Sequence, residues 1–348
     1  MIRRLLAFSL LLATPAFAQT HVTVALAVPP GPTDGVTAAA VELGLFREAG
    51  IDPEFIVFQG AGAFLPQIAQ KKVLIGLPLI EPVLESYDTG KAKLPVTFFY
   101  NANPYNGLEL AVLASSPYQT IADLKGQAIG VGALTWGTIP QTRAMLRDAG
   151  LTPGSNVDIV PVGVLGSGFQ ALRTGKVAAL NYNDAWTRLM EQQGTPLRRL
   201  PLKPIFLSAI SNAYVAHQDT LRDQPDLLAR FGRVVTEISA VCDAVPVYCV
   251  KAFWRAHPET RPRPEDEATT LAANLETMQR RTKRMAETAP VPGQFDLAAL
   301  RAYVAALHQT GEMASEDIPI ERLFSNALVP AFSKFDRETV IARARAVP

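Results

Sequence analysis

The side chains best suited to chemistry with a small molecule are aromatic and neutral hydrogen-bonding groups in six short segments. These segments cover 30–34, 59–64, 77–81, 103–106, 135–138 and 182–186. The candidate ligand-binding residues in them are Thr33, Asp34, Gln59, Gly60, Phe64, Pro78, Glu81, Asn103, Tyr105, Thr135, Trp136, Thr138, Tyr182, Asn183, Asp184 and Trp186. Aromatic rings stack on flat molecules, and amides and hydroxyls bind them by neutral hydrogen bonds. The pattern favours noncovalent binding of a small organic molecule.

The charges in these segments narrow the kind of molecule. Asp34, Glu81 and Asp184 are their only acids, and they contain no Lys or Arg. Phosphates and dicarboxylates usually recruit bidentate arginine. We therefore expect a neutral or weakly basic flat ligand, such as a pyrimidine, with a carboxylate that accepts from an amino group. A sulfonate stays open, because helix N-termini and hydroxyls can bind it.

Several candidates have a plain structural explanation as well. Phe64 and Trp186 fit a lobe core as well as a ligand wall, and Tyr182 fits both equally. Asp34 and Asp184 can also be explained as caps of the helices that follow them. Trp136, which lies between Thr135 and Gly137 in a strand-to-helix turn, is the strongest single candidate for ligand contact.

Signatures of enzymes and metal sites are missing from the sequence. The four histidines are scattered, and no HExxH, GxSxG or phosphate-binding GxxxxGK[ST] pattern occurs. We expect no catalytic residues, no metal and no cofactor. Carboxylates that meet only in the folded chain keep a hydrolase open as an alternative.

The two cysteines, Cys242 and Cys249, are seven residues apart. On one continuous helix they would be roughly 10 Å apart along the axis, whereas a disulfide needs Cα atoms about 4.4–6.8 Å apart. Pro246 lies between them and can end a helix. A disulfide therefore predicts a helix–turn–helix corner at 243–246. We expect this structural bridge in an oxidising compartment.

The first 18 residues predict export. Arg3 and Arg4 precede an apolar run from Leu5 to Leu12, and Ala16-Phe17-Ala18 matches a small-x-small cleavage site. The run is shorter than the roughly 20 residues that span a bilayer. No Cys follows it, so we expect a periplasmic chain without a lipid anchor. The paired arginines leave twin-arginine export as an alternative.

The order of elements predicts two α/β units in series, which suits a chain of 348 residues with a net charge of +1. Predicted strands are 22–28, 54–58, 73–76 and 95–101, then 110–114, 129–132, 157–162 and 178–182. Helices between them favour parallel sheets covered on both faces. We expect 206–216 to be extended, the chain beyond 220 to be helical, 257–267 to connect helices, and 279–287 to be a solvated helix face. The charge gives no support for nucleic acid as a partner.

Four segments resemble the substrate-binding proteins of nitrate/sulfonate/taurine and thiamine-pyrimidine-precursor ABC importers. They are 40–51 (AVELGLFREAGI), 121–131 (IADLKGQAIGV), 171–179 (ALRTGKVAA) and 182–186 (YNDAW). Their order and spacing carry the resemblance across 22–235. Ala179 and Ala185 depart from the family's usual acid and proline.

The resemblance implies a type II periplasmic binding protein fold, an α/β fold of two lobes with a two-segment hinge and a cleft between them. It implies a first lobe of 19–106 and 212–348, a second lobe of 107–211, and crossovers near Tyr105-Asn106 and Ser211-Asn212. The family captures solutes by lobe closure and delivers them to an ABC permease in the cytoplasmic membrane. We expect a monomer that binds a pyrimidine or thiamine precursor. The alternatives are a sulfonate/taurine-type binding protein and a sensor that presents its ligand to a membrane receptor.

Overall fold

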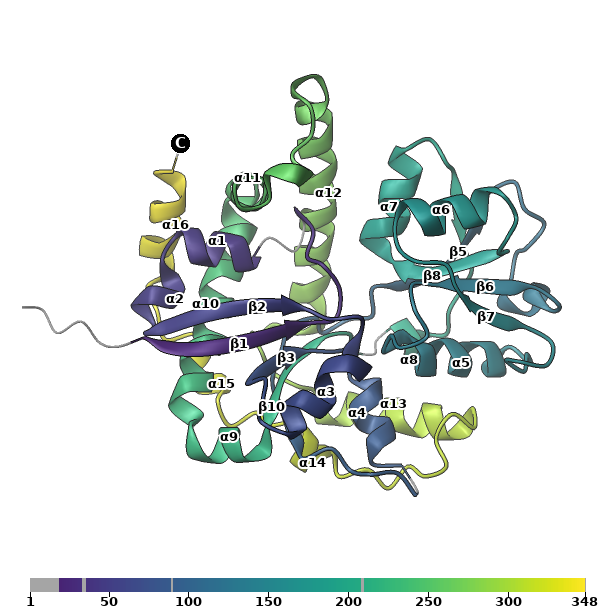
Figure 1. The fold of residues 1–348 in the computed structure, drawn as a ribbon, viewed down its shortest axis with the longest axis horizontal. Helices are drawn as coiled ribbons and strands as arrows, with labels where there is room; N and C mark the ends of the chain where they lie inside the picture. Colours follow the sequence, from purple (N-terminus) through teal and green to yellow (C-terminus); the bar gives the residue numbers. More distant parts are fainter. Residues whose placement is uncertain (1–18, 33–35, 89, 208–209, 348) are drawn as a thin grey trace, which may run out of the picture.

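The computed structural model describes residues 19–32, 36–88, 90–207 and 210–347 and shows two lobes, each built on its own five-stranded sheet (Figure 1). The predicted signal peptide and two predicted ligand residues, Thr33 and Asp34, lie outside the described residues. None of the described helices combines the length and apolarity needed to cross a membrane.

The sheet of the first lobe has the strand order β2-β1-β3-β10-β4. Its strands are β1 (Thr20–Leu26), β2 (Ile51–Val57), β3 (Ile75–Leu77), β4 (Val96–Asn101) and β10 (Ala213–His217). The helices between them are α1 (Val36–Glu42), α2 (Leu45–Glu48), α3 (Ala61–Ala69) and α4 (Glu81–Ser86). β1 is parallel to β2 and β3, but β10 is antiparallel to β3 and β4. The prediction of a parallel sheet therefore holds for β1 with β2 and β3 and is wrong for β10.

The sheet of the second lobe has the order β7-β6-β8-β5-β9 and is also mixed. Its strands are β5 (Leu108–Leu113), β6 (Ala128–Val131), β7 (Asp158–Pro161), β8 (Ala179–Asn183) and β9 (Leu197–Arg199). Its helices are η2 (Ile121–Leu124), α5 (Thr138–Asp148), α6 (Gly166–Arg173), α7 (Asp184–Gln192) and α8 (Pro204–Leu207). β5 runs antiparallel to both β8 and β9. The two lobes thus share one plan, a mixed sheet with helices on both faces.

Two stretches of chain join the lobes. The chain leaves the first sheet after Asn101 and returns to it at Ala213. The stretches lie side by side, because the Asn103 N–H donates to the Asn212 carbonyl (2.9 Å) and the Asn106 side chain donates to the Phe206 carbonyl (2.7 Å). The returning stretch starts with helix α8, so the prediction of an extended 206–216 holds only for its strand part.

The C-terminal part is helical and packs on the first lobe. Its helices are α9 (Gln218–Asp223), α10 (Pro225–Ala244), α11 (Pro246–Ala256), η3 (Pro258–Thr260), α12 (Pro264–Thr288), α13 (Leu297–Gln309), α14 (Ile320–Leu323), α15 (Val329–Phe332) and α16 (Arg337–Arg345). α12 begins inside the predicted connector 257–267, because Pro264 and the acids after it suit a helix N-terminus. It lies between α11 and α7 of the second lobe (Figure 1).

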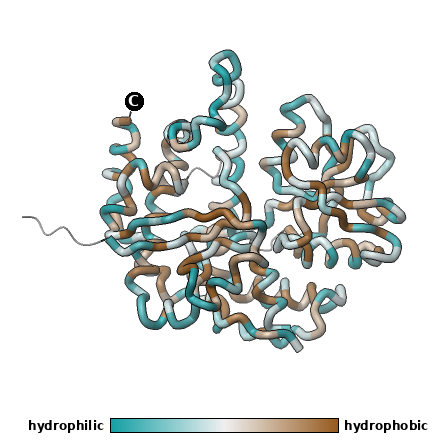
Figure 2. The backbone as a smooth tube through the Cα atoms, in the orientation of Figure 1, coloured by the Kyte–Doolittle hydropathy of each residue, from teal (hydrophilic) through white to brown (hydrophobic). Residues whose placement is uncertain are grey.

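Apolar residues follow the strands and the helix faces that cover them (Figure 2). One apolar cluster crosses the boundary between the lobes, since it contains Phe64 and Leu300 of the first lobe and Met145 and Phe206 of the second. The lobes are therefore packed together on the side where α5 and α8 meet α4 and α13.

Ion pairs join the two lobes at the same boundary, which we call the seam. Arg143 of α5 donates to Glu312 (Nε–Oε1 2.7 Å) and to Glu85 of α4 (2.9 Å), and Arg147 also pairs with Glu312. The Glu312 side chain is 1% exposed. A buried carboxylate needs such partners, because burial without them costs several kcal/mol.

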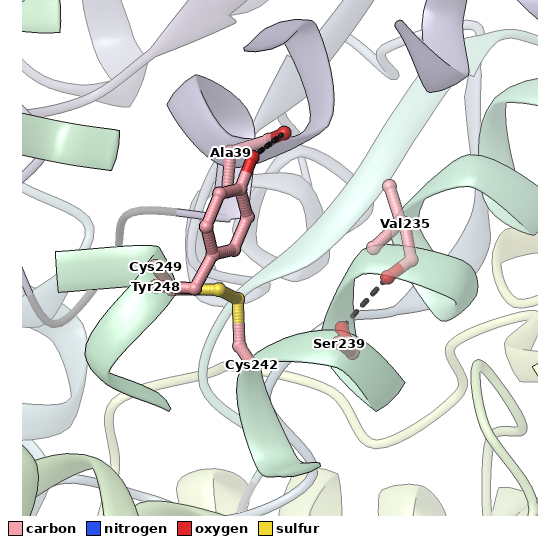
Figure 3. The surroundings of a disulfide bond; sticks show 6 residues. All are labelled: Ala39, Val235, Ser239, Cys242, Tyr248 and Cys249. Atoms are coloured by element: carbon pink, nitrogen blue, oxygen red, sulfur yellow. Dashed lines mark hydrogen bonds between the residues drawn. A yellow bond between two sulfur atoms is a disulfide. The ribbon is translucent and has the colours of Figure 1, made fainter. Parts of the chain in front are cut away.

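The disulfide Cys242–Cys249 closes the corner between α10 and α11, with the Cα atoms 5.5 Å apart (Figure 3). One helix ends at Ala244 and the next begins at Pro246. The structure confirms the predicted bridge and the corner it required. Tyr248, beside Cys249, donates to the Ala39 carbonyl (3.4 Å) and ties α11 to α1.

We expect Glu312→Gln to lower the free energy of unfolding by about 2 kcal/mol, because the two guanidiniums lose the carboxylate with which both of them pair. The loss is limited because both arginines are partly exposed to water, which screens their charge. The exposed neighbour Glu316 gives a control, Glu316→Gln, which should unfold like the wild type. Urea unfolding of both variants measures the difference. Equal stability of the two variants would contradict this role of Glu312.

Candidate functional site

Loops from the two lobes touch directly at the carboxyl ends of β2 and β6. The Thr135 hydroxyl donates to the Gln59 carbonyl (2.9 Å) across the boundary. Gly60 has a φ of +89°, and a Cβ there would lie 2.7 Å from the Thr135 carbonyl oxygen. Gly137 similarly lies against Leu79. The structure thus brings the predicted segments 59–64, 77–81 and 135–138 together.

Three aromatic residues of the second lobe form one cluster. The Trp136 ring centroid lies 5.7 Å from that of Trp186 and 6.4 Å from that of Tyr182. Tyr182 is fully buried, and its hydroxyl donates to the Gly163 carbonyl. Trp136 and Trp186 are partly exposed. These two rings therefore offer stacking surface, whereas the Tyr182 ring is buried and packs against both of them.

Glycines make room for this cluster. A Cβ on Gly132, at the end of β6, would lie 1.9 Å from the Trp136 ring. A Cβ on Gly168, in the first turn of α6, would lie 1.7 Å from the Tyr182 hydroxyl. Both distances are far below van der Waals contact, so the aromatic arrangement requires glycine at both positions.

Basic side chains reach this region from α12. Arg281 donates to the Asn103 side-chain oxygen (2.6 Å). The Arg284 guanidinium lies 4.4 Å from the Tyr105 ring centroid and 3.6 Å from the Asp184 carboxylate. Residues 279–287 are therefore not simply a solvated face, which corrects the prediction for this stretch. The six predicted segments contain no Lys or Arg, but α12 brings arginines to two of them.

Asp184 begins α7, the helix that also carries Trp186, and its carboxylate pairs with Arg284 of α12. Burial, and secondarily the charge of Glu109, raises the pKa of Asp184, while Arg284 and its neighbours oppose that rise. Asp184 is not the cap of α7. Asn183 is, because its side-chain oxygen accepts from the Trp186 N–H (2.9 Å). A carboxylate and two guanidiniums, which contact Asn103, Tyr105 and one another, are therefore gathered where α12 meets the second lobe.

Other predicted residues lie in the core. Phe64 is fully buried, with its ring 5.8 Å from that of Phe58. Pro78 is buried, and its carbonyl accepts from the Ala213 N–H (3.2 Å). Thr138 is buried at the start of α5, and its hydroxyl lacks a hydrogen-bond partner among the described residues. These three side chains are therefore buried in the core beneath the loops.

Glu81 is fully buried near the seam. One carboxyl oxygen accepts from the Tyr303 hydroxyl (2.7 Å), and the other has no hydrogen-bond partner among the described residues. Burial raises the pKa of Glu81 to about 7, against an ordinary value of 4.5. It carries a proton through most of the acidic range and is then a donor as well as an acceptor.

Two hollows of about 270 Å³ each lie away from these loops. One is beside the disulfide and α12, and the other is on the second lobe between η2, α5 and residues 201–206. Within the described ranges, no three His, Cys, Asp or Glu side chains are grouped so as to hold a metal ion.

Comparisons with known proteins place these features in a family. A family model described as NMT1/THI5 like matches residues 35–243. The comparison with curated proteins gives no match.

Among solved structures, the alkanesulfonate-binding protein SsuA from Xanthomonas axonopodis pv. citri, bound to MOPS, is similar at 13% identity and a TM-score of 0.65, over 90% of this chain and 99% of that one. The periplasmic nitrate-binding protein NrtA from Synechocystis PCC 6803 is similar at 11% identity and a TM-score of 0.63, over 95% and 90%. A DSZB mutant in complex with biphenyl-2-sulfinic acid has 15% identity and a TM-score of 0.52, over 89% and 97%. At these identities the likeness shows the fold, which is that of periplasmic binding proteins.

The raised pKa of Glu81 predicts that stability falls with pH. Between its ordinary value of 4.5 and about 7, the unfolded chain releases the Glu81 proton while the folded chain keeps it. The free energy of unfolding should therefore decrease by about 3 kcal/mol across that window and level off above it. Glu81→Gln should match the wild type at pH 4 and exceed it at pH 8 in urea unfolding. An equal offset between the two proteins at both pH values would contradict this.

Gly132→Ala should displace the Trp136 ring, because no space exists for the added methyl group. We expect tryptophan emission to shift to the red and stability to fall by about 1–3 kcal/mol. Gly166→Ala is the control, since a Cβ on Gly166 meets open space. Emission of Gly132→Ala that is identical to the control would show that the ring is not confined by this glycine.

Proposed function

The chain belongs to the NMT1/THI5-like family, and from that premise we propose that it is the substrate-binding component of an ABC importer, which holds a small organic solute between its lobes. The fold shared with SsuA and NrtA supports this proposal, since those proteins are described as binding alkanesulfonate and nitrate. The chain would bind its solute without chemical conversion.

The observation that carries the choice of ligand is the pair of α12 arginines at the boundary between the lobes. Arg281 and Arg284 face Asn103 and Asp184, a neutral amide and one carboxylate. Guanidiniums in a partly buried place bind sulfonates and carboxylates by charge-assisted hydrogen bonds. We therefore favour a small organic acid, and the sulfonate reading of the sequence takes precedence over the neutral one.

The aromatic cluster keeps a second candidate, a flat heteroaromatic such as a pyrimidine or thiamine precursor. Trp136 and Trp186 are partly exposed with their rings 5.7 Å apart, and Asp184, which begins the helix that carries Trp186, has a carboxylate that can accept from an amino group. A ligand with both an acid group and an amino group would use the arginines and Asp184 together.

Lobe movement about the two crossovers is the proposed capture step. Residues 19–106 with 212–348 would form one rigid lobe and 107–211 the other. The contact of Thr135 with Gln59 would form on closing, because it joins loops of opposite lobes. Closure would remove the ligand from water, which strengthens its charged hydrogen bonds.

The cellular setting follows from the same proposal. Cleavage after residue 18 would release a periplasmic monomer without a lipid anchor, and the closed form would dock on a permease in the cytoplasmic membrane. A sensor protein would share the site and differ only in the membrane partner.

Thermal unfolding with ethanesulfonate, taurine, benzoate and cytosine tests the ligand class. A ligand at 100 times its Kd should add about 2.7 kcal/mol of stability. We expect an acid to stabilise the protein, Arg281→Gln and Arg284→Gln each to weaken its binding about tenfold or more, and Trp136→Ala to weaken every ligand. Lys283→Gln is the control, because Lys283 is exposed on the other side of α12.

Binding of cytosine alone, with no effect of the arginine variants, would select the heteroaromatic candidate. Conversion of any of these compounds into a product would contradict the proposed role.

A further inference from the structure

Helix α12 is long but weakly embedded. It runs for 25 residues, of which only Thr277 and Met278 are buried. Met278 belongs to the apolar cluster of the first lobe, and Leu271 and Leu275 pack partly buried against it. The apolar contacts of the middle and C-terminal turns of α12 are thus few, and the helix is also held by polar contacts, from Glu276 to Arg188 of α7 and from Arg281 to Asn103.

The turn of α12 that carries Met278 faces the disulfide corner between α10 and α11. Cys242, Asp243 and Pro246 on the corner line a hollow of about 270 Å³ with four residues of α12. The α12 residues in this hollow are Met278, Gln279, Thr282 and Lys283. Both α10 and α11 contact α12 around this hollow, so a shift of the corner would move the surface on which α12 packs.

The opposite side of the same helix turns carries the arginines. At about 100° per residue, the four lining residues occupy one arc of α12, and Arg280, Arg281 and Arg284 occupy the other. Arg281 reaches Asn103, and Arg284 reaches Tyr105 and Asp184. The hollow and the width of α12 therefore lie between the disulfide corner and the candidate binding site.

A single residue connects the two helices of the corner. Val245 alone separates α10 from α11, its N–H donates to the Val241 carbonyl of α10, and the start of α11 has no side-chain cap. Tyr248 ties α11 to α1 through its hydrogen bond to the Ala39 carbonyl. The cross-link between Cys242 and Cys249 is then the bond that sets the angle at which the corner meets α12.

We propose that the Cys242–Cys249 disulfide is a positioning element for the binding site, which holds α12 so that Arg281 and Arg284 stay at the lobe boundary. The inference rests on the proposed function in that these arginines contact the ligand. The bond acts through α12 and does not touch the ligand.

Hydrogen exchange of the purified protein tests this without any ligand. We compare the wild type with the double variant Cys242→Ala, Cys249→Ala. Amides of residues 279–287 should exchange about tenfold faster in the double variant, while amides of both sheets keep their rates. Faster exchange confined to α10 and α11, with α12 unchanged, would overturn the proposal.

Two further variants separate positioning from general loosening. Met278→Ala leaves the disulfide intact and should reproduce the faster exchange of 279–287, because it removes the buried contact of α12. Tyr248→Phe removes the tie to α1 and should leave α12 unchanged. Equal acceleration of α12 by Tyr248→Phe and by the double variant would overturn a specific role of the disulfide.

Ligand affinity is the measurement that a purely stabilising disulfide would leave unchanged. The double variant should lose about tenfold in affinity for ethanesulfonate and much less for cytosine, since only the acid uses the arginines. An equal loss for both probes would overturn the proposal. If the wild type binds neither probe and the double variant still loosens α12, the positioning role stands and the proposed function fails.

Discussion

The arrangement of the candidate site depends on how the partly buried carboxylate of Asp184 is neutralised. Asp184 begins α7 in the second lobe, and burial raises its pKa because a charged carboxylate loses water there. Its ion-pair partner, Arg284, comes from α12 of the first lobe and rests on the ring of Tyr105 in the crossover. The pair therefore joins the C-terminal helices, the crossover and the second lobe at one point.

This junction explains why the site combines an aromatic half and a charged half. The loops that follow β6 and β8 contribute Trp136 and Trp186, whose positions are fixed by the Tyr182 ring and by the glycines beneath the cluster. The charged half is added by α12, which is separated from those loops by about a hundred residues of sequence.

Much of the fold could be predicted because its signals are local. Alternating strands and helices indicated two α/β units, and the Cys242–Cys249 spacing around Pro246 required the corner that the structure shows. The antiparallel strands could not be predicted in the same way. β10 joins the first sheet only after the chain has built the second lobe, and its pairing with β3 and β4 depends on contacts between distant segments.

The site was harder to predict for a related reason. A polar, charged helix such as α12 is typical of a solvated face, and no local pattern shows that Arg281 will meet Asn103. Phe64 follows a glycine loop like a ligand-contacting residue, but the face of α3 on which it lies turns into the core. Asn183 and Asp184 are both good caps, and only the backbone geometry assigns the cap to Asn183.

The most direct test of this account is a crystal structure of the protein with the small molecule that stabilises it most. We predict electron density for that molecule between the lobes, in contact with Trp136 and with Arg281 or Arg284. Density only in the hollow beside Cys242 or in the hollow beside η2, with the lobe boundary unchanged, would contradict capture of a solute between the lobes.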